Sequence, residues 1–295
     1  MTGKTNREID HVTGVETTAH EWDGVKELNN PLPKWWLYTF YACIVWAVGY
    51  MIVYPSWPTL NGYTKGLWGY SQRLTVAAEI KAALASQGSI RTKLEQTPLS
   101  AVRADSDLTR FATAGGAAAF QTNCAPCHGR GAQGFIGYPN LNDDDWIWGG
   151  SLDQILGTIQ HGIRSSDDKR TRDSAMPKYG LDKLLKDAEI DDAAEFVLSL
   201  SAKQIAAINN PAIERGAKLF VEQCASCHGE KGLGNQDLGA PNLADGIWLH
   251  GGKKSQVVES IRTGRGGMMP AWSTRLDPVT IKSLAFYVHS LGGGK

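Results

Sequence analysis

The pattern of hydrophobic and polar positions sets one long apolar stretch apart from a chain that is otherwise mixed. Residues 35–54 read WWLYTFYACIVWAVGYMIVY and contain no charged side chain. As a helix this stretch would span about 30 Å, the thickness of the hydrocarbon core of a bilayer. Tryptophan and tyrosine stand at both ends, as they do at membrane interfaces, and prolines lie on both sides. The pattern predicts a transmembrane anchor over residues 35–57.

Two other interpretations of this stretch fit less well. A cleaved signal peptide has a short leader and a short apolar core, whereas here residues 1–34 form a long polar leader and no Ala-x-Ala site follows. A buried helix of a soluble domain would keep a polar face, whereas this stretch is apolar on every face. An uncleaved anchor that contacts the lipid bilayer is the interpretation that remains.

Basic residues predict the orientation of the anchor. The leader carries more lysine and arginine than the segment after the anchor, and the richer side normally stays in the cytoplasm. We therefore expect residues 1–34 in the bacterial cytoplasm, a single pass through the inner membrane, and the rest of the chain in the periplasm. The residues compared are Lys4, Arg7, Lys26 and Lys34 before the anchor, and Lys65 and Arg73 after it.

Beyond the anchor, one sequence pattern occurs twice. A connector (58–110) with a helical stretch at 72–96 leads to two similar stretches, 111–201 and 208–295. A repeat of about 90 residues is too long for a solenoid and predicts two tandem domains of one fold. The first copy has extra polar residues near 165–173. The matching pairs include Phe120 and Phe220, Pro139 and Pro241, Trp146 and Trp248, Gly150 and Gly252, Met176 and Met269, and Phe196 and Tyr287.

Each copy carries a Cys-x-x-Cys-His motif. The two thiols of such a motif form thioethers with the vinyl groups of haem, and the histidine becomes the proximal ligand of the iron. A thioredoxin-like redox pair would need a βαβ pattern, which this sequence lacks, and a zinc site would need the cysteine pairs at shorter spacing. We therefore expect two covalently bound haem c groups. The residues are Cys124, Cys127 and His128 in the first copy, and Cys224, Cys227 and His228 in the second.

The expected fold is mainly α, with one N-terminal transmembrane helix followed by two tandem class I cytochrome c domains. In each copy a first helix (113–126 or 212–226) carries glycine and phenylalanine four positions apart, on one face. A closing helix (190–200 or 278–291) brings an aromatic residue across it. We expect each first helix to pack against the closing helix of its own copy.

Met176 and Met269 are the candidates for the sixth ligand of each iron. Both precede proline in a loop before the closing helix, and a thioether is a neutral ligand that raises the potential of haem iron. Methionine is scarce in the chain, since only Met268 remains besides Met1 and the anchor's Met51. Met268 competes with Met269, which is favoured because it matches the Met-Pro pair of the first copy. We expect each methionine to serve its own copy.

Three histidines are rival ligands. His161 aligns with Thr263, lies beside a glycine shared by both copies and fits a surface or loop position better; His250 is the second rival. His289 lies on the closing helix, where we expect it to pack or to form a hydrogen bond. Because each copy has its own methionine, no open catalytic iron and no catalytic residue is expected.

Composition adds little to this picture. Acidic and basic residues are equal in number, 30 of each, so nothing points to a nucleic-acid partner. The fifth cysteine, Cys43, lies in the anchor without a partner and is interpreted as inert.

The leader carries the most specific resemblance to a known family. Residues 20–36 read HEWDGVKELNNPLPKWW, and with the anchor and the two haem motifs they resemble the dihaem subunit III (CcoP, called FixP in rhizobia) of bacterial cbb3-type cytochrome c oxidases. The resemblance covers essentially the whole chain. It implies that His128 and His228 are proximal ligands and that Met176 and Met269 are the opposite axial ligands.

The resemblance also implies partners. Electrons from a soluble or membrane-bound cytochrome c donor would pass through the two haems to a mono-haem cytochrome c subunit. They would then reach a catalytic subunit with haem b, haem b3 and copper B, which reduces oxygen and pumps protons; a small fourth subunit belongs to such complexes. The chain itself would be an electron carrier without the oxygen-reduction site. A free-standing anchored dihaem carrier and a dihaem peroxidase are the alternative functions.

Replacing Cys124 and Cys127 with alanine tests the haem motifs. We expect the variant to keep one covalent haem, because the second motif is intact, and to show about half the haem stain in a denaturing gel. Undiminished staining would contradict attachment at this motif.

Overall fold

The computed structural model describes residues 8–201 and 210–292 of the chain. Lys4 and Arg7, which the orientation argument uses, lie outside the described residues, as do positions 208 and 209 at the start of the predicted second domain. The chain divides into two compact units, one up to Ala85 and one from Ser86 onwards. The two units are described separately below.

The leader contains a β-hairpin that the sequence analysis did not anticipate. Strand β1 (Thr17–Trp22) pairs antiparallel with β2 (Val25–Leu28). Asp23 and Gly24 connect them with positive φ angles of 50° and 86°, as a tight turn between twisted strands requires. Asp-Gly between the strands was the signal available in the sequence.

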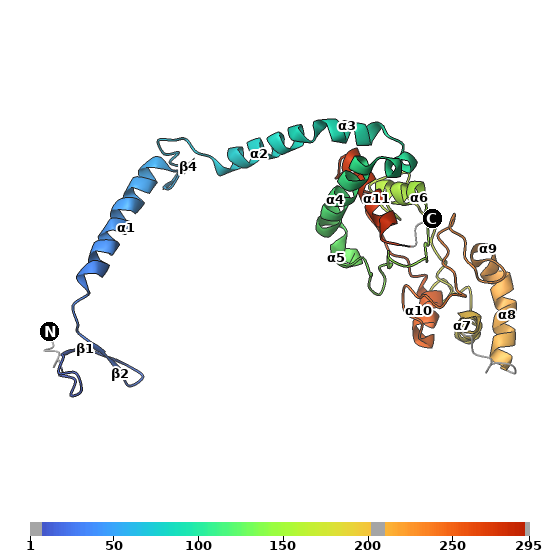
Figure 1. The fold of residues 1–295 in the computed structure, drawn as a ribbon. Helices are drawn as coiled ribbons and strands as arrows, with labels where there is room; N and C mark the ends of the chain where they lie inside the picture. The colour runs from blue at the N-terminus through green and yellow to red at the C-terminus, as the bar shows by residue number, and fades with distance from the viewer. Residues whose placement is uncertain (1–7, 202–209, 293–295) are drawn as a thin grey trace. The chain divides into compact units, whose positions relative to one another are not determined.

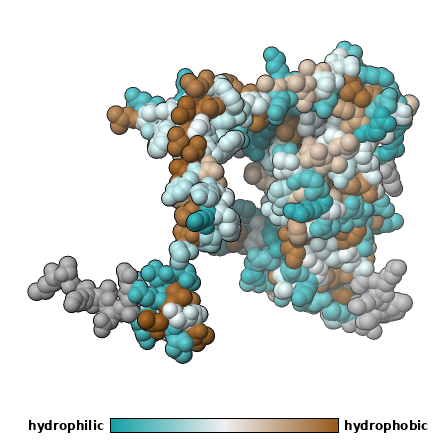
Figure 2. Space-filling model, turned by 60° about the vertical axis from the view of Figure 1, so that its left-hand side comes forward, coloured by the Kyte–Doolittle hydropathy of each residue, from teal (hydrophilic) through white to brown (hydrophobic). Residues whose placement is uncertain are grey.

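Helix α1 (Lys34–Val53) coincides with the predicted anchor. It follows Pro33 and ends at Tyr54, which is extended before Pro55. None of its residues is buried, and brown and pale residues cover it in the space-filling view (Figure 2). Among the described residues it is the one helix long and apolar enough to cross a membrane. Its exposed apolar surface therefore fits contact with lipid.

The segment after α1 folds back onto the end of that helix. A short hairpin, β3 (Pro58–Thr59) with β4 (Gly62–Tyr63), reverses the chain. The Trp68 amide then donates to the Val53 carbonyl, and its ring meets Tyr54 edge-on at 5.1 Å between centroids. This aromatic group stands where the helix would leave the bilayer. Helix α2 (Gln72–Ser86) follows.

The second unit contains two hydrophobic cores. The first core includes Leu94, Leu99, Val102, Leu108, Phe120, Ile155, Ile159, Ile281 and Leu284. The second core includes Tyr179, Ile190, Ala194, Val197, Phe220, Val257 and Ile261.

The first core is built by helices from both ends of the unit. The connector contributes to it through α3 (Gly88–Gln96) and the 3-10 helix η1 (Leu99–Ala104). The predicted helical stretch at 72–96 is thus divided between two helices, α2 and α3. The elements around this core are α3 (Gly88–Gln96), the 3-10 helix η1 (Leu99–Ala104), α4 (Ser106–Asn123), α6 (Leu152–His161) and α11 (Pro278–Ser290). Those around the second core are α7 (Asp187–Ser201), α8 (Pro211–Gln223) and α10 (Lys254–Thr263).

The closing helices are exchanged between the two copies of the repeat. In Figure 1 the red α11 lies with the green α4, and the yellow α7 lies with the orange α8. The Phe120 ring meets Tyr287 at 5.5 Å, and the Phe220 ring meets Phe196 at 5.1 Å. The expectation that each first helix packs against the closing helix of its own copy is therefore wrong. Because the closing helices match position for position, either one offers the same aromatic residue to either first helix.

Each exchanged helix pair crosses at a glycine. A Cβ added at Gly116 would lie 2.2 Å from the Ser283 carbonyl oxygen, and one added at Gly216 would lie 2.1 Å from the Asp192 carbonyl oxygen. Only a residue without a side chain permits such an approach between helix backbones. The matched glycines of the repeat are therefore contact points between α4 and α11 and between α8 and α7.

Two neighbouring glycines on α4 allow this contact to be tested. Gly116→Ala should lower the free energy of unfolding by about 2 kcal/mol or more, because the new methyl group overlaps backbone that has little freedom to move. Gly115→Ala is the control, since its Cβ would meet nothing closer than 3.8 Å. Alanine there should be neutral or stabilise the helix by up to about 1 kcal/mol. Urea denaturation followed by circular dichroism measures both, and equal effects would contradict the crossing.

Candidate haem sites

Each Cys-x-x-Cys-His motif forms a single helical turn directly after the first helix of its copy. Helix α5 (Ala125–His128) follows α4, and α9 (Ala225–His228) follows α8. The His128 amide donates to the Cys124 carbonyl at 2.9 Å, and the His228 amide donates to the Cys224 carbonyl at 3.0 Å. One turn thus holds two thiols and an imidazole close together in each copy.

A proline carbonyl orients each motif histidine. His128 Nδ1 lies 3.1 Å from the Pro139 carbonyl oxygen, and His228 Nδ1 lies 3.0 Å from that of Pro241. With the proton on Nδ1, the imidazole donates to this carbonyl and leaves Nε2 as a lone-pair ligand. Burial lowers the pKa of both histidines, which favours the neutral ring. The match between Pro139 and Pro241 had no assigned role in the sequence, and this hydrogen bond supplies one.

The motif cysteines do not pair with one another. All five cysteines of the chain lie among the described residues, and none forms a disulfide. Burial, with a smaller effect of the neighbouring motif cysteine, raises the pKa of Cys124 and of Cys224 to about 11. Cys127 and Cys227 are exposed. The described residues contain no group of three or more His, Cys, Asp or Glu placed to hold a metal ion.

Both candidate methionines lie against a core, but not the core of their own copy. Met269 packs against the first core, which contains Phe120, and Met176 packs against the second, which contains Phe220. Met268 is 65% exposed. The structure therefore brings Met269 near the first haem motif and Met176 near the second, and it leaves Met268 on the surface.

The rival histidines already bind other protein groups or lie on a loop. His161 Nδ1 lies 2.7 Å from Asp168 Oδ2, in the extra segment of the first copy. His289, as expected, forms a hydrogen bond, since its Nδ1 lies 2.8 Å from an Arg103 guanidinium nitrogen. His250 lies beside the loop of the first copy, with its ring 3.8 Å from the position of an added Cβ at Gly137.

The matched tryptophans pack on backbone. A Cβ added at Gly150 would lie 2.7 Å from the Trp146 ring, and one added at Gly252 would lie 2.5 Å from the Trp248 ring. Each indole therefore occupies the space that a side chain at the glycine would fill. This contact explains why the tryptophan and the glycine pair recur together in both copies.

The loops that follow the two haem motifs meet each other. The Gly137 amide of the first copy donates to the Leu249 carbonyl of the second at 2.7 Å. A hollow of about 220 Å³ lies between these loops. Asp145 lines this hollow, and burial together with Asp245 and Asp143 raises its pKa to about 6. The second unit thus joins its two halves across an acidic hollow.

The raised pKa of Asp145 predicts a pH effect on stability. The folded carboxyl binds its proton more tightly than the unfolded one, so stability should fall as pH rises from about 4 to about 6. Asp145→Asn should raise the free energy of unfolding at pH 7 by about 1 kcal/mol, after allowance for partial exposure. The difference should vanish below about pH 4. Asp144→Asn, at the exposed neighbour, is the control in the same denaturation measurement; equal effects would contradict the assignment.

Comparison with known proteins gives matches along nearly the whole chain. A family model of the N-terminal domain of cytochrome oxidase-cbb3, FixP, matches residues 14–61. A model described as cytochrome C oxidase, cbb3-type, subunit III matches residues 111–197 and again 211–288. The first match spans the leader hairpin and the anchor, and the second covers both copies of the repeat.

Full-length relatives give the same result. The chain is 52% identical to a cbb3-type cytochrome c oxidase subunit FixP of Bradyrhizobium diazoefficiens, with 98% of each chain covered. It is 50% identical to the FixP subunit of Azorhizobium caulinodans, with 97% of this chain and 96% of the relative covered. It is 49% identical to the CcoP subunit of Cereibacter sphaeroides, with 95% of each covered.

Proposed function

The chain belongs to the family of cbb3-type cytochrome c oxidase subunit III, the FixP and CcoP proteins, and from this membership we propose that it passes electrons to the oxidase through two covalent haems c. The family resemblance drawn from the leader and the motifs is thereby confirmed, as is the mainly α fold with cytochrome c domains. The chain is an electron-transfer subunit of an oxidoreductase complex. The number of haems, their ligands, the partners and the topology are the parts proposed here.

One observation carries the proposal for the haems. In both copies a single turn presents two thiols and an imidazole whose Nδ1 is bound to a proline carbonyl. Cys124 and Cys127 would hold one haem and Cys224 and Cys227 the other, through thioethers. Haem supplies an iron that changes oxidation state by one electron. The buried, neutral histidines would ligate that iron through Nε2, which a fixed Nδ1 hydrogen bond favours.

Methionine ligation at the opposite face is proposed for both irons. Met176 and Met269 are partly buried and pack against the cores that contain Phe220 and Phe120, whereas Met268 is exposed. Histidine and methionine together give a haem suited to electron transfer, since both axial positions are filled. Two filled irons argue against a peroxidase, which needs an open position.

The anchor and the leader support membership of a membrane complex. Helix α1 would cross the inner membrane with the leader in the cytoplasm and the haem domains in the periplasm, where covalent haem attachment takes place. The proposed partners are a catalytic subunit with haem b, haem b3 and copper B, a mono-haem cytochrome c subunit and a small fourth subunit. A soluble or membrane-bound cytochrome c would be the donor. The family match over residues 14–61 supports a specific contact between the leader and the other subunits, rather than a leader that only precedes the anchor.

Purification of the tagged chain in detergent tests this assembly. We expect it to elute with copper and with b-type haem in addition to its own covalent haem. Elution as a stable chain without either would favour a free-standing dihaem carrier and contradict the oxidase proposal.

A variant of the β1–β2 hairpin tests whether the leader contacts the other subunits. Trp22 and Val25 form a pair across the turn and are 69% and 68% exposed. Trp22→Ser with Val25→Ser should reduce co-eluting copper and b-type haem several-fold and leave the covalent haem stain unchanged. Val12→Ser is the control, since this residue is 80% exposed but lies before the matched segment. Equal losses of copper and b-type haem in both variants would contradict a specific contact of the hairpin with the other subunits.

A further inference from the structure

We infer that the fold-back segment, residues 54–71 between α1 and α2, lies in the interface of the lipid bilayer and is held there by the end of α1. The inference rests on the proposed membrane crossing of α1. It goes beyond that proposal, because a crossing helix alone does not say what surrounds the chain that follows it. The partner of the segment's exposed apolar surface is the bilayer at the level of the lipid headgroups.

The fold-back segment completes the end of α1 without water. An α-helix leaves its last four backbone carbonyls without partners inside the helix, and at a protein surface these groups often bind solvent. Here the Tyr50 carbonyl accepts from the Tyr54 amide at 2.8 Å. The Met51 carbonyl accepts from the Ser56 hydroxyl at 2.9 Å.

The returning chain supplies the other two partners. The Leu67 amide donates to the Ile52 carbonyl at 3.1 Å, and the Trp68 amide donates to the Val53 carbonyl at 3.2 Å. Gly66 permits this approach, since its φ is +68° and an added Cβ would lie 2.2 Å from the Val53 carbonyl oxygen. Each of the last four carbonyls of α1 thus has an uncharged partner within the chain, as a helix end requires at a depth where water is scarce.

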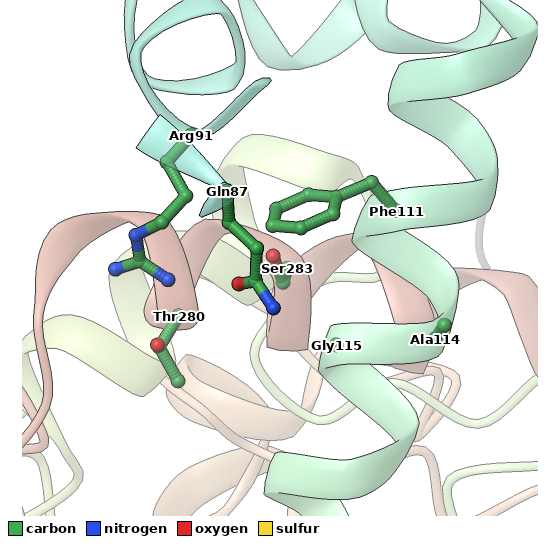
Figure 3. Close-up of a pocket in the computed structure, with 7 residues that line it drawn as sticks. All are labelled: Gln87, Arg91, Phe111, Ala114, Gly115, Thr280 and Ser283. Atoms are coloured by element: carbon green, nitrogen blue, oxygen red, sulfur yellow. The ribbon is translucent and has the colours of Figure 1, made fainter. Parts of the chain in front are cut away.

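A helix of the second unit ends in a different way. At the end of α3, the Lys282 ammonium donates to the carbonyls of Leu94 at 2.9 Å and of Glu95 at 3.0 Å. Figure 3 shows the hollow of about 250 Å³ beside this helix, which Gln87 and Arg91 help to line. A charged group at the helix end and polar side chains around an open hollow are suited to contact with water. The uncharged groups that complete α1 are suited to a less polar medium.

Large apolar side chains point away from the fold-back segment. Leu60 at the tip of the β3–β4 hairpin is fully exposed, and Leu67 and Trp68 are 78% and 69% exposed. Because Leu67 and Trp68 are bonded to the end of α1, the apolar surface of the anchor continues onto the segment. Trp57 and Tyr63 are exposed as well, and aromatic rings with a polar edge are enriched at the level of the headgroups. The bilayer that covers the end of α1 therefore fits the segment too.

The charges of this region suit the same surroundings. The sequence contains no Asp or Glu from Tyr54 to Ala78, whereas Lys65 and Arg73 lie in this stretch and are exposed. Anionic headgroups attract basic side chains and repel acidic ones. A lysine can also lay its apolar stem along the bilayer and keep its ammonium at the headgroups.

Spin labels on the full-length chain test this location. Cys43→Ser removes the one cysteine outside the haem motifs, and Leu60→Cys or Leu67→Cys then carries a nitroxide. The chain is isolated with the subunits that accompany it and placed in nanodiscs of phosphatidylethanolamine and phosphatidylglycerol. The parent without an added cysteine gives the background. The readouts are collisions of the label with oxygen, which concentrates in lipid, and with a water-soluble nickel chelate.

Two reference positions calibrate the collisions. Val45→Cys on the exposed surface of α1 is the lipid reference, and Gln87→Cys at the hollow of Figure 3 is the water reference. We expect the labels at Leu60 and Leu67 to collide with nickel several-fold less, and with oxygen more, than the label at Gln87.

The other outcomes separate the inference from the membrane crossing. Water-like labels at Leu60 and Leu67, with a lipid-like label at Val45, would overturn the inference and leave the crossing intact. Shielding of both labels from both reagents would show that another subunit covers the segment, and would also overturn it. A water-like label at Val45 would overturn the crossing and the inference together.

Two glycines test whether the end of α1 holds the segment. Gly66→Ala drives a methyl group into the Val53 carbonyl, so the returning chain must move away from α1. Gly69→Ala is the matched control, because Gly69 also has a positive φ, +56°, but nothing lies within 4 Å of an added Cβ. With the label at Leu67, Gly66→Ala should raise nickel collisions several-fold, and Gly69→Ala should leave them close to the parent value. Equal changes in both variants would overturn the role of the end of α1.

Discussion

The second unit depends on two helix crossings, each made at a glycine. At Gly116 and Gly216 the backbones of two helices approach so closely that no side chain fits between them. The crossing fixes the direction of the first helix, and the first helix ends where the haem motif begins. The position and orientation of both thiols and of the histidine therefore follow from a contact on the preceding helix, about two turns before the first cysteine. Large aromatic residues then fill the space beside each crossing, with Phe120 against Tyr287 and Phe220 against Phe196.

The haem motifs and the methionine loops are held in place by different contacts. One side of each site is a single turn whose histidine is bound to a proline carbonyl, so its direction is fixed by backbone alone. The loop that carries the proposed methionine ligand is bonded to the end of α6 or α10. An electron carrier benefits from rigid surroundings, because they change little when the iron changes charge. The loops after the two motifs also touch, through Gly137 and Leu249, and this contact joins the two copies within one unit.

Local features were predictable from the sequence, and long-range pairing was not. The apolar run of α1, the two Cys-x-x-Cys-His turns and the Met-Pro loops each depend on neighbouring residues, and the family assignment built on them is confirmed. The leader hairpin was missed although its Asp23-Gly24 turn is a local signal. The sequence could not predict which first helix each closing helix packs against. Helices α7 and α11 match position for position and offer equivalent contacts to either first helix. The roles of Pro139 and Pro241 could not be predicted for another reason. Each acts through its backbone carbonyl, which every residue type has. The domain bounds and the axial ligands stay predictions.

Exchange of the closing helices also sets an order for folding. Helix α4 and the first haem motif are made early in synthesis, but the first core lacks one wall until α11, the last helix described, has been completed. Contacts between such distant segments form slowly, because the entropy of closing a long loop is lost before the contacts stabilise the structure. Completion of the first core is therefore delayed until α11 is available. Helices α7 and α8 are neighbours in sequence and can pair as soon as both have formed. A chain cut between the two copies would separate α4 from α11 and α8 from α7, so each half would lose the helix that its first helix contacts in the intact chain.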